Sequence, residues 1–229
     1  MNPEISVITS ISLDHTKTLG DTLELIASEK AGIIKKDVPV VLAPQPREAL
    51  SVLKKVAITK RAKIIETAPE NIFRSRFTLS GQSASVRGLR HTYDIDLPLL
   101  GDHQLENVST AITSVEMLSN RGFACTKQSV IRGVRNVKWP GRFEVLSVDS
   151  PTIIVDGAHN DYSMKKLVQS VKQYFGCGRI LIVFGALDGH SIQGMVMELA
   201  TIKPEVIVVR SRHPKSIPSD VAADIVTQA

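Results

Sequence analysis

The feature that most constrains the fold is an alternation of short apolar runs with stretches of helical periodicity near the N-terminus. The runs at residues 4–12, 38–42 and 62–66 have the length and composition of buried strands. Between them, residues 21–35 and the stretch that begins at Pro46 repeat apolar side chains every three or four positions. This strand–helix–strand–helix–strand order is typical of parallel α/β structure. The sequence therefore predicts a parallel sheet with covering helices at this end of the chain.

The middle of the chain changes character. Residues 67–100 alternate aromatic and aliphatic side chains with small and polar ones and contain glycines at turn positions, which predicts short antiparallel strands and hairpins. A helical pattern follows over residues 102–121 and ends at Gly122. A shorter helix is predicted over residues 127–134.

The residues WPGR at 139–142 look like a junction, beyond which α/β order resumes. The predicted strands are 143–148, 152–155, 180–184 and 206–209, and the predicted helices are 161–175, 192–201 and 219–229. The run at 180–184 is apolar throughout, which is expected of a strand covered on both faces. The expected division is residues 1–137 for a first domain and residues 138–229 for a second.

Composition narrows the function classes. The chain has 229 residues, 43% of them hydrophobic, which suits a globular protein of one large or two small domains. No apolar run is long enough to span a membrane, no signal peptide precedes the first strand, and Cys125 and Cys177 are too few for a disulfide framework. These features predict a cytoplasmic protein without a membrane partner. The net charge of +5 suits an anionic substrate such as a nucleotide or polyglutamate, and the absence of nucleic-acid-binding signatures predicts no nucleic-acid partner.

The end of the first predicted strand and the helix after it carry polar residues. Asp14 and His15 follow the strand, where a parallel sheet places its ligand-binding residues. Asp21 is the expected N-cap of the helix, and Glu24 three residues later completes a capping-box-like pattern. By pattern alone, His15 is either a metal-binding residue or a histidine on a solvent-exposed loop.

Lys30 falls on the expected apolar side of this helix, four residues after Ile26 and three after Ala27. A lysine in that place snorkels to solvent, pairs with a carboxylate, or is chemically changed. Burial would lower the pKa of the amine and make it reactive toward carbon dioxide, giving an anionic carbamate able to hold a metal ion. The pattern alone favours a snorkelling lysine.

Polar residues also follow other predicted strands at their carboxyl ends. The richest group is DGAHN at residues 156–160, and smaller groups lie at 185–191 and 211–213. Asp156 could accept hydrogen bonds from ribose hydroxyls or orient a water on magnesium; the alternative is a turn that caps the next helix. The sequence contains no GxxxxGK[ST] loop, no GxGxxG and no recognisable nucleophilic triad.

Four stretches occur in a characteristic order along the chain. They are TSISLDH (residues 9–15) running on to EKAGIIK (29–35), LLGDHQLEN (99–107), WPGRF (139–143) and DGAHN (156–160). In this order and spacing they resemble the folylpolyglutamate synthase and dihydrofolate synthase family, a branch of the Mur ligases. The resemblance covers most of the chain. It implies an α/β fold, with a partial Mur-ligase central domain (a parallel sheet with helices plus a small antiparallel subdomain) followed by a Rossmann-like C-terminal domain.

The resemblance also implies an activity. Such enzymes use ATP and Mg²⁺ to join L-glutamate to a folate or dihydropteroate carboxylate through an acyl phosphate, and they are cytoplasmic monomers. By similarity, His15 is a magnesium ligand, Lys30 matches the family's carbamylated lysine, and His159 lies by the incoming glutamate. The residues that match ATP contacts are Asn107, Arg142 and Asp156.

The chain departs from the family pattern in several places. The family's glycine-rich P-loop and a magnesium-binding glutamate would precede residue 1, and the last strands of the C-terminal domain would follow the final helix. Gly189, His190 and Ser191 stand where the family commonly has Asp-Lys-Asp, and Asp161 follows Asn160 where proline is usual. Without the P-loop amides, turnover of ATP by this chain alone is not expected. Two alternatives stay open: another Mur-type amino-acid ligase, and a non-catalytic remnant or interaction module of the same fold.

Overall fold

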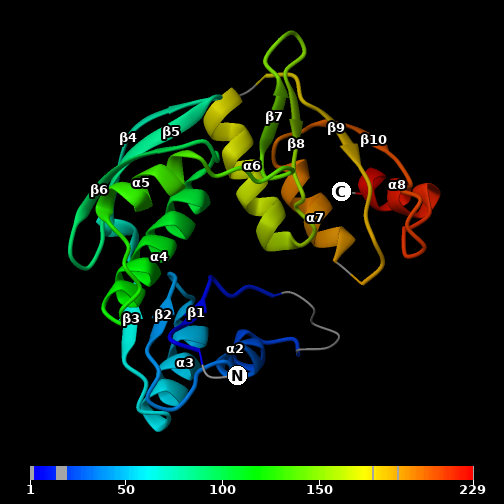
Figure 1. The fold of residues 1–229 in the computed structure, drawn as a ribbon. Helices are drawn as coiled ribbons and strands as arrows, with labels where there is room; N and C mark the ends of the chain where they lie inside the picture. Colours follow the sequence, from blue (N-terminus) through cyan, green and yellow to red (C-terminus); the bar gives the residue numbers. More distant parts are fainter. Residues whose placement is uncertain (1–2, 14–19, 177, 190, 229) are drawn as a thin grey trace.

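The structure is a computed structural model that describes residues 3–13, 20–176, 178–189 and 191–228 (Figure 1). An N-terminal sheet with its helices, a small antiparallel sheet and a C-terminal α/β unit are arranged around the long helix α4 (Asp102–Ser119). Within the described ranges, no helix is both long enough and apolar enough to cross a membrane.

The N-terminal unit has the predicted parallel α/β order. Its elements are β1 (Ser6–Ile8), α2 (Leu23–Ala31), β2 (Val40–Leu42), α3 (Arg47–Thr59) and β3 (Ile64–Glu66). The strands pair in parallel in the order β1-β2-β3, with Ser6 opposite Val40 and Val40 opposite Ile64. Helices α2 and α3 form an apolar cluster on one face, and Met117 of α4 packs with Val41 in a second cluster. The predicted parallel sheet is confirmed, although each strand is shorter than its apolar run.

Helix α2 begins and ends differently from the prediction. Its N-cap is Thr22, whose hydroxyl accepts a hydrogen bond from the Leu25 amide at 3.3 Å. The prediction that Asp21 caps the helix is therefore wrong, and Glu24 does not stand at the third helical position that a capping box requires. The helix ends at Ala31, not at residue 35. Threonine and aspartate are both good N-caps, so the sequence pattern alone did not decide between two adjacent candidates.

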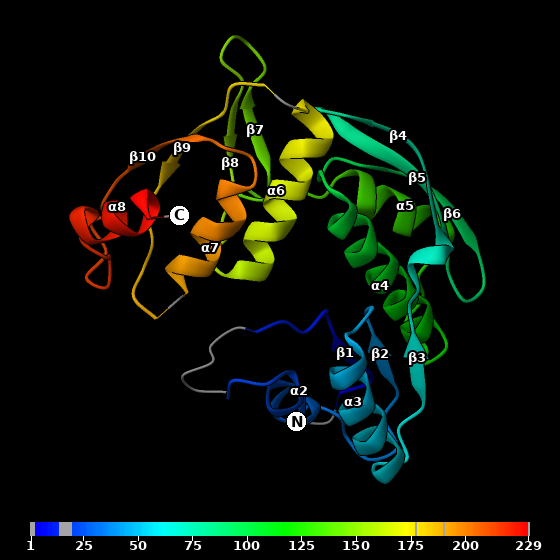
Figure 2. The ribbon, with the colours of Figure 1, turned by 180° about the vertical axis from the view of Figure 1, so that it is seen from behind.

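The antiparallel sheet predicted in the middle of the chain is present. It consists of β4 (Ile72–Thr78), β5 (Gly81–Arg87) and β6 (Thr92–Leu97), which pair in sequence order after a 3₁₀ turn at Pro69–Asn71. Alternate side chains of β5 and β6 face inward, as the two-residue period of a strand requires. They pack against α4 and α5 (Lys127–Arg135), and Figure 2 shows both helices behind this sheet.

Two buried polar side chains hold α4 against the antiparallel sheet. Near the start of the helix, the Nε2 of Gln82 donates to two carbonyl oxygens of the preceding loop, including that of Gly101 at 3.0 Å. Near its end, the carboxylate of Glu116 accepts hydrogen bonds from the turn at residues 89–91 and from the hydroxyl of Tyr93. Gln82 on β5 therefore holds the turn that leads into α4 in place.

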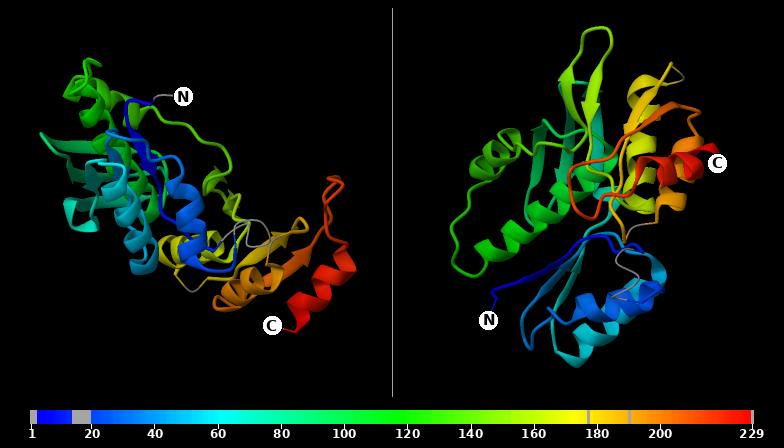
Figure 3. Two further views of the ribbon diagram at one scale, coloured as in Figure 1. Left: turned by 90° about the horizontal axis from the view of Figure 1, so that it is seen from below. Right: turned by 90° about the vertical axis from the view of Figure 1, so that its right-hand side faces the viewer.

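The C-terminal unit follows the predicted element order. Its elements are β7 (Glu144–Ser147), β8 (Ile153–Val155), α6 (Asp161–Phe175), β9 (Leu181–Phe184), α7 (Ile192–Ala200), β10 (Glu205–Val208) and α8 (Ser219–Thr227). Strands β9 and β10 pair in parallel, whereas β7 and β8 form an antiparallel pair. Figure 3 shows this unit from two further sides, with α6 turned toward the rest of the molecule.

Strand β9 is covered on one face only by the described residues. Phe184 is buried in the cluster formed with α6 and α7, whereas Leu181 is 58% exposed and Val183 is 64% exposed. On β10, Ile207 is 49% exposed. The prediction that residues 180–184 are buried on both faces is wrong for the described chain, because α6, α7 and α8 all contribute to one cluster that leaves alternate side chains bare.

Candidate functional site

Three of the characteristic stretches meet beside the first turn of α4 (Figure 1). Residues 99–107 lead into α4, residues 139–143 lead into β7, and residues 156–160 lead from β8 into α6. The backbone N–H of Gly157 donates to the carbonyl of Gly141 at 2.9 Å, which joins the last two stretches directly.

Asp156 organises the contact between these two loops. Its Oδ2 accepts a hydrogen bond from the backbone N–H of Phe143 at 2.8 Å, and its Oδ1 accepts one from Ala158 at 2.7 Å. Phe143 is held in the left-handed region, with φ of 46°. Asp156 therefore forms the turn of the predicted alternative, but Asn160, and not Asp156, caps the next helix. Each carboxylate oxygen has about two acceptor positions, so hydroxyl donors such as those of a ribose can still bind to it.

Arg142 belongs to the loop at residues 139–143, and its side chain lies beside the loop at residues 156–160. Its guanidinium carbon is 5.7 Å from the centroid of the Trp139 ring, a cation–π distance that orients the side chain. One guanidinium nitrogen is 3.8 Å from the point where a Cβ on Gly157 would stand. Arg142 and Trp139 also line a hollow of about 290 Å³. Within the described part of the chain Arg142 makes no ion pair with a carboxylate, so its charge is available to an anionic ligand.

The first turns of α4 carry a row of hydrogen-bonded side chains. Asn107 is exposed, and its Nδ2 donates to Gln104 Oε1 at 3.2 Å. The Nε2 of Gln104 lies 3.0 Å from the Nε2 of His103. Burial is the main cause that lowers the pKa of His103 below its ordinary 6.5; Lys166 and Arg142 lower it further, and Asp156 and Asp102 oppose them. Charged residues of the loops at 139–143 and 156–160 therefore affect the pKa of His103.

Side chains of α6 form hydrogen bonds that join the C-terminal unit to the start of α4 and to the segment after β1. The hydroxyl of Tyr174 accepts a hydrogen bond from the backbone N–H of Gly101 at 3.3 Å. The hydroxyl of Tyr162 lies 3.2 Å from that of Ser10, which follows β1. Lys166 Nζ is 5.4 Å from the centroid of the Tyr162 ring. None of these α6 residues was identified from the sequence, because on a helix they read as ordinary surface positions.

His159 shares the loop of Asp156. Its side chain is exposed, and its ring Nδ1 donates to the carbonyl of Gly157 at 2.8 Å. The next residue, Asn160, is the N-cap of α6 and forms a capping box with Ser163. The predicted position of His159 beside an incoming glutamate stays a prediction.

The remaining predicted site residues are not joined to this cluster. Lys30 is exposed: in the last turn of a helix that ends at Ala31, its long side chain reaches solvent, which is the snorkelling alternative that the sequence pattern favoured. Among the described residues, no hydrogen bond or ion pair links it to α4 or to either loop. Asp14 and His15 lie outside the described residues. In the part of the chain that the structure describes, no group of three or more His, Cys, Asp or Glu side chains could hold a metal ion.

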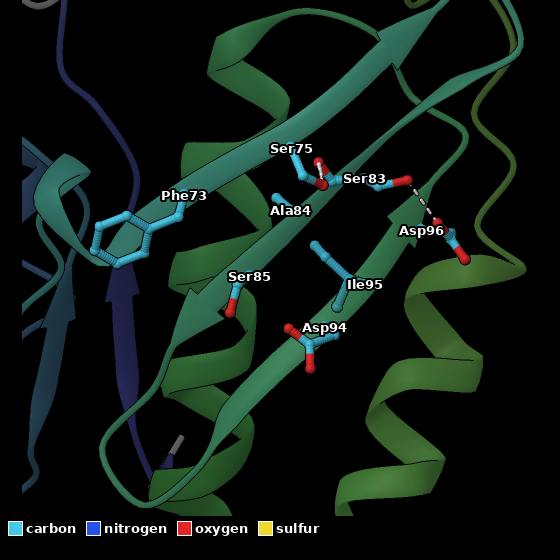
Figure 4. Close-up of a pocket in the computed structure, with 8 residues that line it drawn as sticks. All are labelled: Phe73, Ser75, Ser83, Ala84, Ser85, Asp94, Ile95 and Asp96. Carbon is cyan, nitrogen blue, oxygen red and sulfur yellow. Dashed lines mark hydrogen bonds between the residues drawn. The ribbon is translucent and has the colours of Figure 1, made fainter.

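A second hollow lies on the outer face of the antiparallel sheet (Figure 4). It measures about 260 Å³ and is lined by residues of all three strands, including Phe73, Ser85 and Asp94. The hydroxyl of Ser83 donates to Asp96 across two of these strands at 2.7 Å. None of the predicted site residues lines this hollow, so it is separate from the site beside α4.

Comparison with known proteins agrees with the resemblance seen in the sequence. Residues 1–115 match the family model of the Mur ligase middle domain, and residues 141–229 match that of the Mur ligase, glutamate ligase domain. A dihydrofolate synthase/folylpolyglutamate synthase of Bacillus subtilis is 36% identical over 206 residues, which are 88% of this chain and 47% of the relative. The folylpolyglutamate synthase of Lacticaseibacillus casei is 32% identical over 228 residues, 95% of this chain and 51% of the relative.

A similar structure is that of Mycobacterium tuberculosis folylpolyglutamate synthase complexed with ADP and AMPPCP. It matches with a TM-score of 0.89 at 29% identity, over 99% of this chain and 52% of that chain. The chain thus spans about half the length of the relatives it matches. Since the middle-domain model alone matches residues 1–115 of 229, this chain belongs to the Mur ligase family, within which it is similar to folylpolyglutamate and dihydrofolate synthases.

Proposed function

We propose that this chain forms the nucleotide-binding and glutamate-joining part of an ATP-dependent ligase that links L-glutamate to a folate or dihydropteroate carboxylate. A carboxylate oxygen of the folate attacks the γ-phosphorus of ATP, and ADP leaves. The glutamate amine then attacks the acyl carbon, inorganic phosphate leaves, and the amine loses a proton. Residues 1–137 and 138–229 are the two domains of this proposal.

The observation that supports the proposal is the convergence of Arg142, Asp156 and the start of α4. Arg142 supplies a planar set of donors that fits phosphate oxygens, and its guanidinium makes no ion pair within the described chain. Asp156 accepts from ribose hydroxyls while its backbone partners hold it in place. The exposed amide of Asn107 binds the nucleotide from α4, whose N-terminus also favours an anion. His159 is the proposed neighbour of the incoming glutamate.

The proposed reaction implies Mg²⁺, which neutralises charge on the transferring phosphoryl group when it is bound. The residue proposed to hold it is His15, which lies outside the described residues; Lys30, proposed as the carbamylated lysine, is exposed in this structure. The described donor set does not fit a metal ion by itself. We therefore assign no step to Mg²⁺ and derive only what the loops at 139–143 and 156–160 do with the nucleotide.

Calorimetric titration of ADP tests the proposal at Arg142. We expect the wild-type chain to bind ADP and Arg142→Ala to bind it about ten- to a hundredfold more weakly, because a charge-assisted hydrogen bond to phosphate contributes about 1.5–3 kcal/mol. The matched control is Arg179→Ala. Arg179 is an exposed arginine that pairs with Glu205 at 2.8 Å, and its removal should leave ADP affinity unchanged.

Three outcomes contradict the proposal. If the folded wild-type chain shows no heat with ADP, the non-catalytic remnant or interaction module becomes the better account. If Arg142→Ala and Arg179→Ala weaken binding equally, the effect comes from net charge and not from a site at Arg142. If ADP binds but another amino acid replaces glutamate in the complete enzyme, the alternative of another Mur-type ligase holds.

A further inference from the structure

A directed chain of hydrogen bonds runs along the first turns of α4. Asn107 Nδ2 donates to Gln104 Oε1 at 3.2 Å, and Gln104 Nε2 lies 3.0 Å from His103 Nε2. The amide nitrogen of Gln104 has only donor hydrogens. His103 Nε2 is therefore the acceptor, and the neutral imidazole carries its proton on Nδ1.

The direction of this chain decides what Asn107 offers to a ligand. One N–H of Asn107 is used by Gln104 Oε1. Its Oδ1 and its second N–H remain, which is one acceptor and one donor. A protonated His103 would carry a hydrogen on Nε2 and could no longer accept from Gln104. The amide of Gln104 would then turn to present Oε1 to His103, and its N–H₂ would face Asn107.

We propose that His103 is a positioning residue that acts through Gln104 and sets which hydrogen-bonding groups Asn107 presents to the nucleotide. With His103 neutral, Asn107 presents an acceptor and a donor. With His103 protonated, Asn107 accepts from Gln104 and presents its two N–H groups. The part that concerns the nucleotide rests on the proposed function, whereas the coupling of the three side chains does not.

The surroundings of His103 favour the neutral imidazole near pH 7, because they lower its pKa below 6.5. The charged groups that face it are Lys166 from α6, Arg142 from the loop before β7, Asp156 from the loop after β8 and Asp102 from α4 itself. Burial and the two cations lower the pKa of His103, and the two carboxylates only partly offset them. The ring is also confined.

Gly101 marks how closely His103 is packed. A Cβ on Gly101 would stand 2.7 Å from His103 Cε1 and 2.7 Å from the hydroxyl of Ser170. The ring therefore has no free space on the side of Gly101 and Ser170. Rotation of the two amides is the response to protonation that leaves the ring in this position.

Side-chain amide spectra of the ligand-free chain test the coupling. In ¹H–¹⁵N spectra recorded from about pH 8 down to about pH 5, the range in which histidines titrate, the N–H₂ signals of Gln104 and Asn107 should shift with the same midpoint as the ring of His103. That midpoint should lie below 6.5. In Gln104→Met, which keeps the volume and removes the amide, His103 should still titrate and the Asn107 signal should stop following it.

The control amide is Asn120, which follows the other end of the same helix and should not follow His103 in either protein. An Asn107 signal that is unchanged while His103 titrates in the wild type would overturn the proposal. So would an Asn107 signal that still follows His103 in Gln104→Met. The wild-type spectra decide the matter even if Gln104→Met does not fold.

Calorimetric titration of ADP at pH values above and below the midpoint of His103 tests whether nucleotide affinity depends on the protonation of His103. An amide edge with one acceptor and one donor pairs with N6 and N7 of adenine, whereas two donors do not. We expect ADP to bind about tenfold more weakly once His103 is protonated, and Gln104→Met to lose this dependence. Coupled amides in a chain that binds no ADP at any pH would refute the proposed function and leave the coupling intact; ADP affinity that does not change across the midpoint would overturn the nucleotide part of the inference.

Discussion

Glu116→Ala is expected to lower the free energy of unfolding by about 3–5 kcal/mol, because it leaves several buried donors without an acceptor. Glu116 is only 3% exposed. Its carboxylate accepts from the backbone N–H of Leu89, from Arg90 at 3.2 Å and from His91 at 3.1 Å. It also accepts from the hydroxyl of Tyr93 at 2.9 Å. Alanine at this place supplies no acceptor and opens a space too polar to be filled by apolar neighbours.

Urea unfolding measures this loss, and Glu106→Ala on the same helix is the control. The side chain of Glu106 is half-buried and makes none of these contacts, so its removal should change stability by less than about 0.5 kcal/mol. Equal losses in the two variants would contradict the account of Glu116 as the anchor of the turn at residues 89–91.

Tyr93 gives a second readout of the same anchor. Burial, followed by the hydrogen bond to Glu116, raises the pKa of Tyr93 from 10.0 to about 12. The folded chain thus holds this proton more tightly than the unfolded chain, so the stabilisation is present below pH 10 and is lost as the pH rises toward 12. In Glu116→Ala, the pKa of Tyr93 should fall but stay above 10.0, because burial remains. Absorbance titration of the tyrosinate follows it directly.

Gly101→Ala is expected to cost about 2–4 kcal/mol, the sum of backbone strain and a steric clash. Gly101 has φ of 95° and ψ of 149°, a conformation that is essentially restricted to glycine. Its Cβ would also meet His103 and Ser170 at 2.7 Å. Relief of that clash requires the His103 ring, the Ser170 hydroxyl or the Gly101 backbone to move, so the hydrogen bond from the Gly101 amide to Tyr174 should weaken.

Gly122→Ala separates strain from clash. Gly122 has the same φ of 95°, and nothing lies within 4 Å of its added Cβ. Its substitution should therefore cost only the strain, about 1 kcal/mol in urea unfolding. If Gly101→Ala and Gly122→Ala lower the free energy of unfolding equally, the contacts of Gly101 with His103 and Ser170 add nothing to the cost of backbone strain, which contradicts the prediction.

The sequence predicted the order of nearly all helices and strands, because apolar periodicity reports which face of an element is buried. It failed where burial depends on partners distant in the chain. The run at residues 180–184 reads as a fully buried strand, yet only one face of β9 is covered by described helices.

The site was predicted in part. Asn107, Arg142 and Asp156 came from matching stretches, and the fold places all three stretches beside α4. His103 lay within one of those stretches but had no assigned role, since its pKa is lowered by burial and then by Lys166 on α6 and Arg142, none of which the local sequence reveals. Ser10 also lay within a matching stretch without an assigned role, and Tyr162 and Tyr174 carry no sequence signal, because their hydrogen bonds join segments far apart in the chain.

A ¹H–¹⁵N spectrum of this chain recorded with and without ADP shows whether three separate stretches form one nucleotide-binding face. We expect the perturbed backbone amides to lie in residues 99–107, 139–143 and 156–160. The hollow around Phe73 and Asp94 serves as an internal control and should not respond. Perturbations confined to that hollow, or a well-dispersed spectrum that does not change with ADP, would contradict the claim.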